Sequence, residues 1–255
     1  MRYPGIKGKT AFVTGAFGGI GMALVNELAA AGATVIATDL HLPPETTTLP
    51  EGVHAYALNV SDSDAVDALV AKVETDHGPI SLCANVAGIL DTGLVTETSD
   101  ARFRAVFDVN LFGVVNVSRA IGALMAQRQS GALVTVSSNA AGIPRHGMAA
   151  YAASKAASTM FTRCLGIELA ASGVRCNIIA PGSTLTPMQT GMWSDENGAS
   201  GVIAGSLETY KTGIPLGKLA TPQDIANAAM FLLSDLAGHI TMADLYIDGG
   251  ATQRG

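Results

Sequence analysis

The sequence predicts an α/β fold in which a doubly wound parallel sheet of about seven strands carries helices on both faces. Short β-branched segments alternate with longer segments of helical periodicity. The expected strands are almost continuously apolar, which is typical of a parallel sheet covered on both faces. No linker-like segment divides the chain, so we expect one domain over residues 1–255. Its long segment of mixed character at about 183–212 is typical of a substrate lid.

The first half of the chain contains four expected strands, at residues 10–15, 34–39, 53–60 and 80–88. Between the first two, apolar residues keep helical spacing from Ile20 until Gly32, which suits a C-terminal cap. After the third strand, Ser61 and Asp64 form the pattern S-x-x-D. We therefore expect a capping box that opens a second helix.

The second half continues the alternation with three strands, at 131–138, 173–182 and 243–250. A long helix is expected over about 100–127, and another helix follows the strand at 131–138. Thr221 is suited to the N-cap of a further helix, with Pro222 at the first helical position and Asp224 closing a capping box.

The composition limits the kinds of partner. Charged residues make up 14% of the chain, against roughly 25% in an average soluble protein, which favours a homo-oligomer. A net charge of −6 without a basic cluster argues against nucleic acid. No unbroken apolar run approaches the roughly 20 residues of a membrane span, and the first residues lack an apolar signal core, so we expect a cytoplasmic protein without membrane contact. The three cysteines, Cys83, Cys164 and Cys176, lie far apart in apolar segments and predict buried thiols and no metal site.

A glycine-rich turn, "TGAFGGIG", joins the first strand to the first helix. Its glycines, Gly15, Gly19 and Gly21, would let the backbone approach a pyrophosphate at the helix N-terminus. Their spacing is G-x-x-x-G-x-G, which differs from the standard dinucleotide fingerprint G-x-G-x-x-G. The position after the first strand, with an acidic residue ending the second, favours a nucleotide site.

That acidic residue, Asp39, predicts which nicotinamide cofactor binds. A carboxylate there can bind both ribose hydroxyls of NAD and would repel the 2′-phosphate of NADP. No arginine or lysine lies beside it, because Phe17 occupies the glycine turn and Leu40 follows Asp39. We therefore expect NAD; the alternative is an aspartate that caps a local loop.

Four polar residues are candidates for catalysis. Tyr151 and Lys155 lie one helical turn apart, and an ammonium beside a phenol lowers the pKa of that phenol. Ser138 ends an expected strand, where open α/β sheets bind ligands. Asn110 interrupts a helical pattern, and such a local violation points to function. Each residue alone is also compatible with a structural role: a surface pair, a serine turn or a satisfied buried amide.

In combination, these motifs resemble the classical short-chain dehydrogenases/reductases along essentially the whole chain. The resemblance is carried, in order, by Thr14-Gly15-x-x-x-Gly19-Ile20-Gly21, Asn85-x-Ala87-Gly88, Asn110, Ser138, Tyr151-x-x-x-Lys155 and Pro181-Gly182. It implies a Rossmann-type fold, a nicotinamide cofactor and a homotetramer.

The resemblance also implies a role for each catalytic residue. Tyr151 would be the general acid/base, and Ser138 would hydrogen-bond the reacting hydroxyl or carbonyl. Lys155 would lower the pKa of Tyr151 and hold the nicotinamide ribose. With Asn110, it would connect a proton relay to water.

The cofactor contacts implied by the resemblance include two departures from the family pattern. Val86 replaces the second asparagine of Asn-Asn-Ala-Gly, and Asn59 replaces an aspartate near the adenine. Thr186, placed as in P-G-x-x-x-T, would contact the carboxamide. The complete set of expected cofactor residues is Gly15, Phe17, Gly19, Ile20, Gly21, Asp39, Leu40, Asn59, Val60, Asn85, Ala87, Gly88, Tyr151, Lys155, Pro181, Gly182 and Thr186.

Three stretches, at 144–157, 169–193 and 213–241, are similar to a branch of the family that oxidises a cyclohexadiene diol carboxylate to a catechol for siderophore synthesis. Arg145 would then bind the substrate carboxylate; the alternative is a subunit contact or exposure to solvent. His146 is expected at the surface or at a gate. The expected substrate residues are Ser138, Tyr151, Arg145, Met148, Met188 and Trp193, with Met192 beside them.

Two other functions are compatible with the same motifs. One is another NAD-dependent alcohol dehydrogenase of the family, acting on a sugar, a polyol or a different cyclic diol. A 3-oxoacyl carrier-protein reductase fits less well, because that reaction usually uses NADPH. The other is a nucleotide sensor that keeps the fold without turnover, which the complete catalytic set disfavours.

Overall fold

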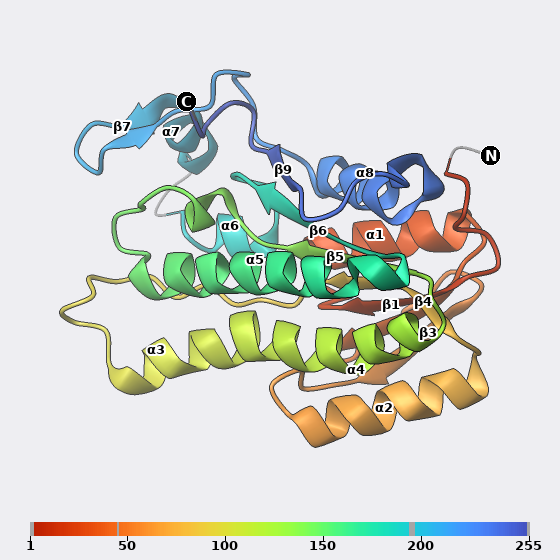
Figure 1. Cartoon of the computed structure of the whole chain (residues 1–255). Coiled ribbons are helices and arrows are strands. Elements are labelled where there is room, and N and C mark those ends of the chain that lie inside the picture. Colours follow the sequence, from red (N-terminus) through yellow and green to blue (C-terminus); the bar gives the residue numbers. More distant parts are fainter. Residues whose placement is uncertain (1–2, 45, 194–196, 254–255) are drawn as a thin grey trace.

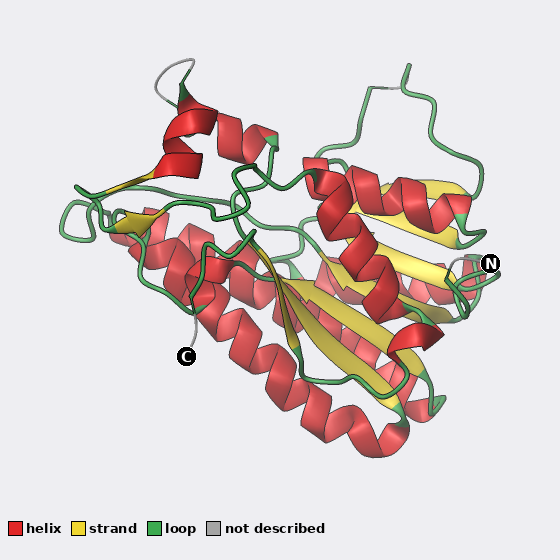
Figure 2. Cartoon of the chain, turned by 90° about the horizontal axis from the view of Figure 1, so that it is seen from above, coloured by secondary structure: helices red, strands yellow, loops and turns green. Residues whose placement is uncertain are grey.

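A seven-stranded parallel sheet forms the centre of the computed structural model (Figures 1 and 2), which describes residues 3–44, 46–193 and 197–253. The strand order is β3-β2-β1-β4-β5-β6-β9, and all neighbours pair in parallel. The strands are β1 (Thr10–Thr14), β2 (Thr34–Asp39), β3 (Val53–Ala57), β4 (Ile80–Asn85), β5 (Gly131–Val136), β6 (Val174–Pro181) and β9 (Asp244–Ile247). The predicted doubly wound parallel sheet is confirmed.

The two faces of the sheet bury two separate apolar clusters. Val13 belongs to the cluster that includes α1 and α8, whereas its neighbour Phe12 belongs to the cluster that includes α2, α4 and α5. Adjacent residues of β1 therefore point to opposite covered faces, as the apolar strand pattern predicts. The helices are α1 (Gly19–Ala30), α2 (Ser63–Asp76), α4 (Gly113–Gln127), α5 (Ala149–Leu169) and α8 (Pro222–Leu233).

The strand order reverses beside β1, and this reversal places the site. β2 lies on one side of β1 and β4 on the other, and Thr14 pairs with Asn85 where β1 and β4 end. The loops that follow these two strands lead to different sides of the sheet. A crevice at such a point is where open α/β sheets bind ligands.

The helix caps confirm two predictions and correct a third. Gly32 takes a φ of +85° just after α1 and donates its N–H to the carbonyl of Ala29. Thr221 and Asp224 form the predicted capping box of α8. The predicted Ser61 box is wrong, because Asp62 is the N-cap of α2 and its carboxylate accepts from the N–H of Ala65. The Ser61 hydroxyl instead donates to Asn59 Oδ1.

The helix predicted over 100–127 is one continuous stretch with a wider turn inside it. α3 (Asp100–Phe107) leads through a π-helical turn (Asp108–Phe112) into α4. By length and composition alone this stretch could cross a membrane, but half of its most apolar window is buried inside the fold, as in a core helix.

The cysteines correct another expectation. Cys83 and Cys176 are buried, but Cys164 is exposed on α5. The buried face of α5 contains Ser158, Thr162 and Gly166. Position 164 lies nearly opposite that face, because successive helical residues are rotated by about 100°.

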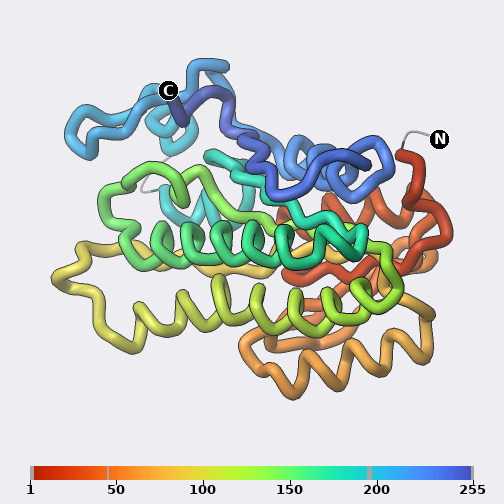
Figure 3. Tube along the Cα trace, viewed as in Figure 1, coloured from red at the N-terminus to blue at the C-terminus, as the bar shows by residue number. Residues whose placement is uncertain are grey.

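The expected substrate loop contains short elements of its own. α6 (Pro187–Thr190) and α7 (Gly198–Ala204) precede the antiparallel pair β7 (Gly205–Ser206) and β8 (Lys211–Thr212). Figure 3 shows this excursion beside the C-terminal segment. The two are joined by the Thr212 hydroxyl, which donates to the carbonyl of Ala251 at 2.9 Å. Residues 194–196 of the expected loop lie outside the described residues.

Candidate active site

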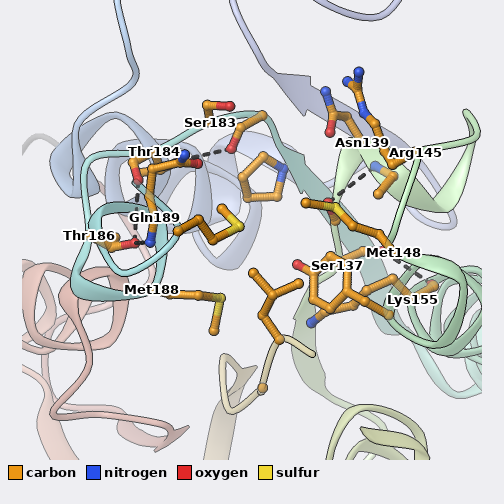
Figure 4. A pocket seen from close by; sticks show the side chains of 18 of the residues that line it. Ser137, Asn139, Arg145, Met148, Lys155, Ser183, Thr184, Thr186, Met188 and Gln189 are labelled. Atoms are coloured by element: carbon orange, nitrogen blue, oxygen red, sulfur yellow. Dashed lines mark hydrogen bonds between the residues drawn. The ribbon is translucent and has the colours of Figure 1, made fainter. Parts of the chain in front are cut away.

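Two adjoining cavities open at the carboxyl ends of the strands. The larger, of about 480 Å³, runs along the glycine turn and the end of β2. The smaller, of about 230 Å³, lies between the end of β5, the start of α5 and the segment after β6 (Figure 4). Ligands in the two cavities would meet at the residues that line both, which are Ile20, Val86, Gly88, Thr186 and Met188.

The glycines of the predicted turn bring backbone to the wall of the larger cavity. A Cβ added at Gly15, where φ is +62°, would lie 2.7 Å from Cα of Ala87. At Gly19 it would lie 2.8 Å from Cγ2 of Thr186, and at Gly21 only 2.0 Å from the Gly15 carbonyl oxygen. Side chains are therefore excluded here. The unpaired N–H groups that open α1 lie at this wall and suit a phosphate.

Asp39 is held at the rim of the same cavity. Its two carboxylate oxygens accept hydrogen bonds from the N–H of Phe17 at 3.0 Å and the N–H of Leu40 at 2.8 Å. The remaining lone pairs can accept from a pair of ribose hydroxyls. The described residues that line this cavity include no lysine or arginine to neutralise a 2′-phosphate.

Thr14 fixes the opposite wall. Its hydroxyl oxygen accepts hydrogen bonds from the N–H groups of Val86 and Ala87, each at 3.1 Å. Val86 replaces the asparagine of the family pattern, but this contact is kept because it is made by the backbone N–H of residue 86. Sequence reasoning quoted Thr14 as part of a motif but gave it no role.

The remaining predicted cofactor residues do not all line the same cavity. Pro181 and Gly182 line the smaller cavity, and Asn85 lines neither. Asn85 is buried, and its amide donates to the Ser118 hydroxyl at 2.8 Å, which links β4 to α4. Those that line the larger cavity are Gly15, Phe17, Gly19, Ile20, Gly21, Asp39, Leu40, Asn59, Val60, Ala87, Gly88 and Thr186.

Tyr151 and Ser138 both line the smaller cavity. Ser138 follows β5 and caps a short helical turn, where its hydroxyl oxygen accepts from the N–H of Ala140 at 3.1 Å. Burial raises the pKa of the Tyr151 phenol, and a hydrogen bond with Ser138 opposes that rise. The two hydroxyls are therefore coupled at the place where a substrate would react.

Lys155 lies beside Tyr151 and also lines the smaller cavity. Its ammonium is 5.9 Å from the centroid of the Tyr151 ring and donates to the carbonyl of Val136 at 2.9 Å. Burial lowers the pKa of Lys155 to about 8. The Lys155 ammonium is directed at a backbone carbonyl, and its role toward the Tyr151 phenol stays a prediction.

Asn110 is at the π-helical turn and has all its polar atoms paired. Its Oδ1 accepts from the N–H of Ile89 at 2.8 Å, while Nδ2 donates to the Ile89 carbonyl at 2.9 Å and to Ser154 Oγ at 3.0 Å. A Cβ on Gly88 would lie 3.2 Å from both Asn110 Oδ1 and Lys155 Nζ. The glycine therefore leaves room for both side chains.

The smaller cavity receives most of the predicted substrate residues. Arg145, Met148, Met188 and Met192 line it, and His146 lies at its wall while remaining exposed. The structure does not place Trp193 there. Its ring packs against Gly198, where an added Cβ would lie 2.2 Å from the indole Cγ.

Sequence reasoning missed other residues at this cavity. Gln189 is buried on α6, and Thr209, Tyr210 and Lys211 reach the cavity from the β7–β8 hairpin. Thr184 also lines it, beside the labelled Thr186 in Figure 4. Only their position inside the expected substrate loop could have indicated them, because no motif marks them.

The chain matches known proteins along nearly its full length. A family model described as "Enoyl-(Acyl carrier protein) reductase" matches residues 15–252. The 2,3-dihydro-2,3-dihydroxybenzoate dehydrogenase of Bacillus subtilis is 54% identical over 260 residues, covering 99% of both chains. Its Escherichia coli counterpart is 40% identical, covering 96% of this chain and 97% of the other. Among solved structures, ligand-free aldohexose dehydrogenase of Thermoplasma acidophilum superposes with a TM-score of 0.87 at 28% identity, covering 99% and 97%.

Proposed function

The chain belongs to the short-chain dehydrogenase/reductase family, and from this premise we propose that it oxidises 2,3-dihydro-2,3-dihydroxybenzoate to 2,3-dihydroxybenzoate with NAD⁺. The observation that carries the proposal is the position of Tyr151, Ser138 and Lys155 on the smaller cavity, which shares lining residues with the larger one. A sequence identity of 54% to a dehydrogenase of that name supports the choice of substrate.

The larger cavity supports NAD as the cofactor. The glycine wall would hold the pyrophosphate, and Asp39 would accept the hydroxyls of the adenosine ribose. Thr186 would meet the carboxamide, because it lines both cavities. NAD⁺, when bound, supplies the acceptor for a hydride.

Tyr151 would move the proton of the reaction. In the oxidative direction its phenolate takes the proton of the C3 hydroxyl, while the hydride leaves C3. Ser138 hydrogen-bonds the same oxygen and holds it in line. The ketone that forms then enolises to the catechol, and aromaticity favours the oxidised product. Lys155 and Asn110 connect the proton to water.

The walls of the smaller cavity suit an apolar ring with a carboxylate. Met148, Met188 and Met192 present flexible, polarisable thioethers that pack on ring faces and edges. Arg145 would pair with the carboxylate. The resemblance to dehydrogenases of this name also supports three further parts of the proposal. The enzyme would act in siderophore synthesis, lie in the cytoplasm and form a homotetramer.

The proposal is tested with purified protein and trans-2,3-dihydro-2,3-dihydroxybenzoate. We expect NADH and fluorescent catechol with NAD⁺, and far slower turnover with NADP⁺. Tyr151→Phe should lower turnover by at least about 100-fold while leaving NAD⁺ affinity unchanged. Intact NAD⁺ binding without any turnover of this diol would refute the substrate and leave the family assignment in place.

A further inference from the structure

The smaller cavity has a strongly one-sided charge. The cations Arg145, Lys155 and Lys211 are among its lining residues, and none of the described residues that line it is Asp or Glu. Lys155 is engaged by the carbonyl of Val136 near the cofactor side. Arg145 and Lys211 are therefore the cations available to a ligand away from the reacting centre.

These two cations line the same cavity, and the charge of Arg145 acts on Lys211. Burial lowers the pKa of Lys211, and the nearby charge of Arg145 lowers it further. Neither forms an ion pair within 4.0 Å among residues 3–44, 46–193 and 197–253. Two like charges held near one another repel, so an anion bound by both would be stabilised.

The nearby acidic residue only partly compensates Arg145. Asp248 raises the pKa of Arg145 through its charge, but burial has the larger and opposite effect. The Asp248 carboxylate is itself occupied, because it accepts from the Gly250 N–H at 3.0 Å and from the Asn139 amide at 3.4 Å. Asn139 and Arg145, both labelled in Figure 4, line the same cavity. One carboxylate beside two cations leaves one positive charge, which matches a monoanion.

The fold fixes Lys211 in place from several directions. Ser206 pairs with Lys211 and Gly205 with Thr212 across the hairpin. The next residue, Thr212, is tied to Ala251. Tyr210 takes a left-handed φ of +54°, so the chain turns sharply just before Lys211. Lys211 is consequently presented by a shaped hairpin rather than by a free surface loop.

We propose that Lys211 is a substrate-specificity residue, which with Arg145 forms a two-cation clamp on the carboxylate of the substrate ring. The inference rests on the proposed function for the identity of that ring. It assigns to the β7–β8 hairpin a chemical role: the hairpin selects ring alcohols that carry an anion over neutral ones. Charge-assisted contacts from two donors also fix the ring's orientation toward Tyr151.

The test compares two ligands of similar shape, the anion 2,3-dihydroxybenzoate and the neutral amide 2,3-dihydroxybenzamide. Their dissociation constants are measured by calorimetry with NADH present. In Lys211→Gln we expect affinity for the benzoate to fall by about 10-fold, as loss of one charge-assisted contact requires. Affinity for the benzamide should stay within about 2-fold. Lys211→Arg keeps the charge and should keep most of the preference.

Lys218→Gln is the matched control, because Lys218 is exposed and does not line the cavity. Equal weakening of both ligands in Lys211→Gln would overturn the clamp, since it would show that the substitution changed the shape of the cavity rather than a charge contact. An unchanged preference would overturn it too. If the wild type fails to oxidise the diol but prefers the benzoate through Lys211, the proposed function falls and the clamp stands.

Discussion

At the scale of single residues, Lys155 combines a function with a cost to stability. Its ammonium is buried, and burial lowers its pKa from 10.5 to about 8. Below pH 8 the amine is charged in both the folded and the unfolded protein. In that range folding therefore carries the full cost of burying the ammonium of Lys155. Between pH 8 and 10.5 the unfolded chain binds the proton and the folded chain releases it, so this contribution makes stability rise with pH.

We therefore expect Lys155→Met to be inactive and yet more stable. Methionine fills similar space without a charge, so at pH 7 the variant should gain about 1–3 kcal/mol in the free energy of unfolding. The gain should shrink near pH 10, where the wild-type amine is neutral when folded. Thermal melts at both pH values measure this. Lys72→Met, at an exposed ion pair, serves as control and should show no gain; a less stable Lys155→Met would contradict the argument.

At the scale of elements, the start of α2 tests which residue caps the helix. The Asp62 carboxylate accepts from the Ala65 N–H at 3.0 Å, whereas the Ser61 hydroxyl donates to Asn59 at 2.7 Å outside the helix. Asp62→Ala should lower the free energy of unfolding by about 1 kcal/mol, which corresponds to about 2–4 °C in Tm for a chain of this size.

Ser61→Ala is the matched control for that cap. It removes only an exposed hydrogen bond, so we expect a smaller change in Tm than in Asp62→Ala. A larger loss in Ser61→Ala would mean that the sequence-based assignment of the cap was right. Activity should be unchanged in Asp62→Ala, because neither Asp62 nor any residue of α2 lines either cavity.

Sequence patterns predicted the elements whose structure depends on nearby residues in the chain. They failed where contacts with distant segments determine the local conformation. The β1–α1 turn was predictable because glycine spacing and strand position report the same backbone. The π-helical turn was not, because Asn110 is satisfied by Ile89 and Ser154 from distant segments. The sequence showed only that Asn110 interrupts a helical pattern. Lys211 was likewise missed, since the β7–β8 pairing that directs it spans two residues per strand.

At the scale of the whole molecule, the predicted tetramer depends on apolar surface that the monomer leaves open. On α5, Met160 is 54% exposed and Ile167 is 67% exposed, and Phe112 beside α4 is 50% exposed. α4 and α5 lie next to each other in the layer that covers one face of the sheet (Figure 1). With only 14% charged residues in the chain, this paired helical surface is suited to a second copy.

We expect light scattering to give a mass about four times the chain mass of 25.9 kDa. Ile167→Glu would place an unpaired carboxylate in the contact, so it should lower the mass to that of a dimer or monomer. Leu42→Glu changes a similarly exposed apolar residue between β2 and β3 and should leave the tetramer intact. Because α5 also contains Tyr151 and Lys155, dissociation should reduce turnover along with mass, by loosening the helix that positions them. A wild type that is monomeric, or an Ile167→Glu variant that keeps the full mass, would show that the α4–α5 surface has another use.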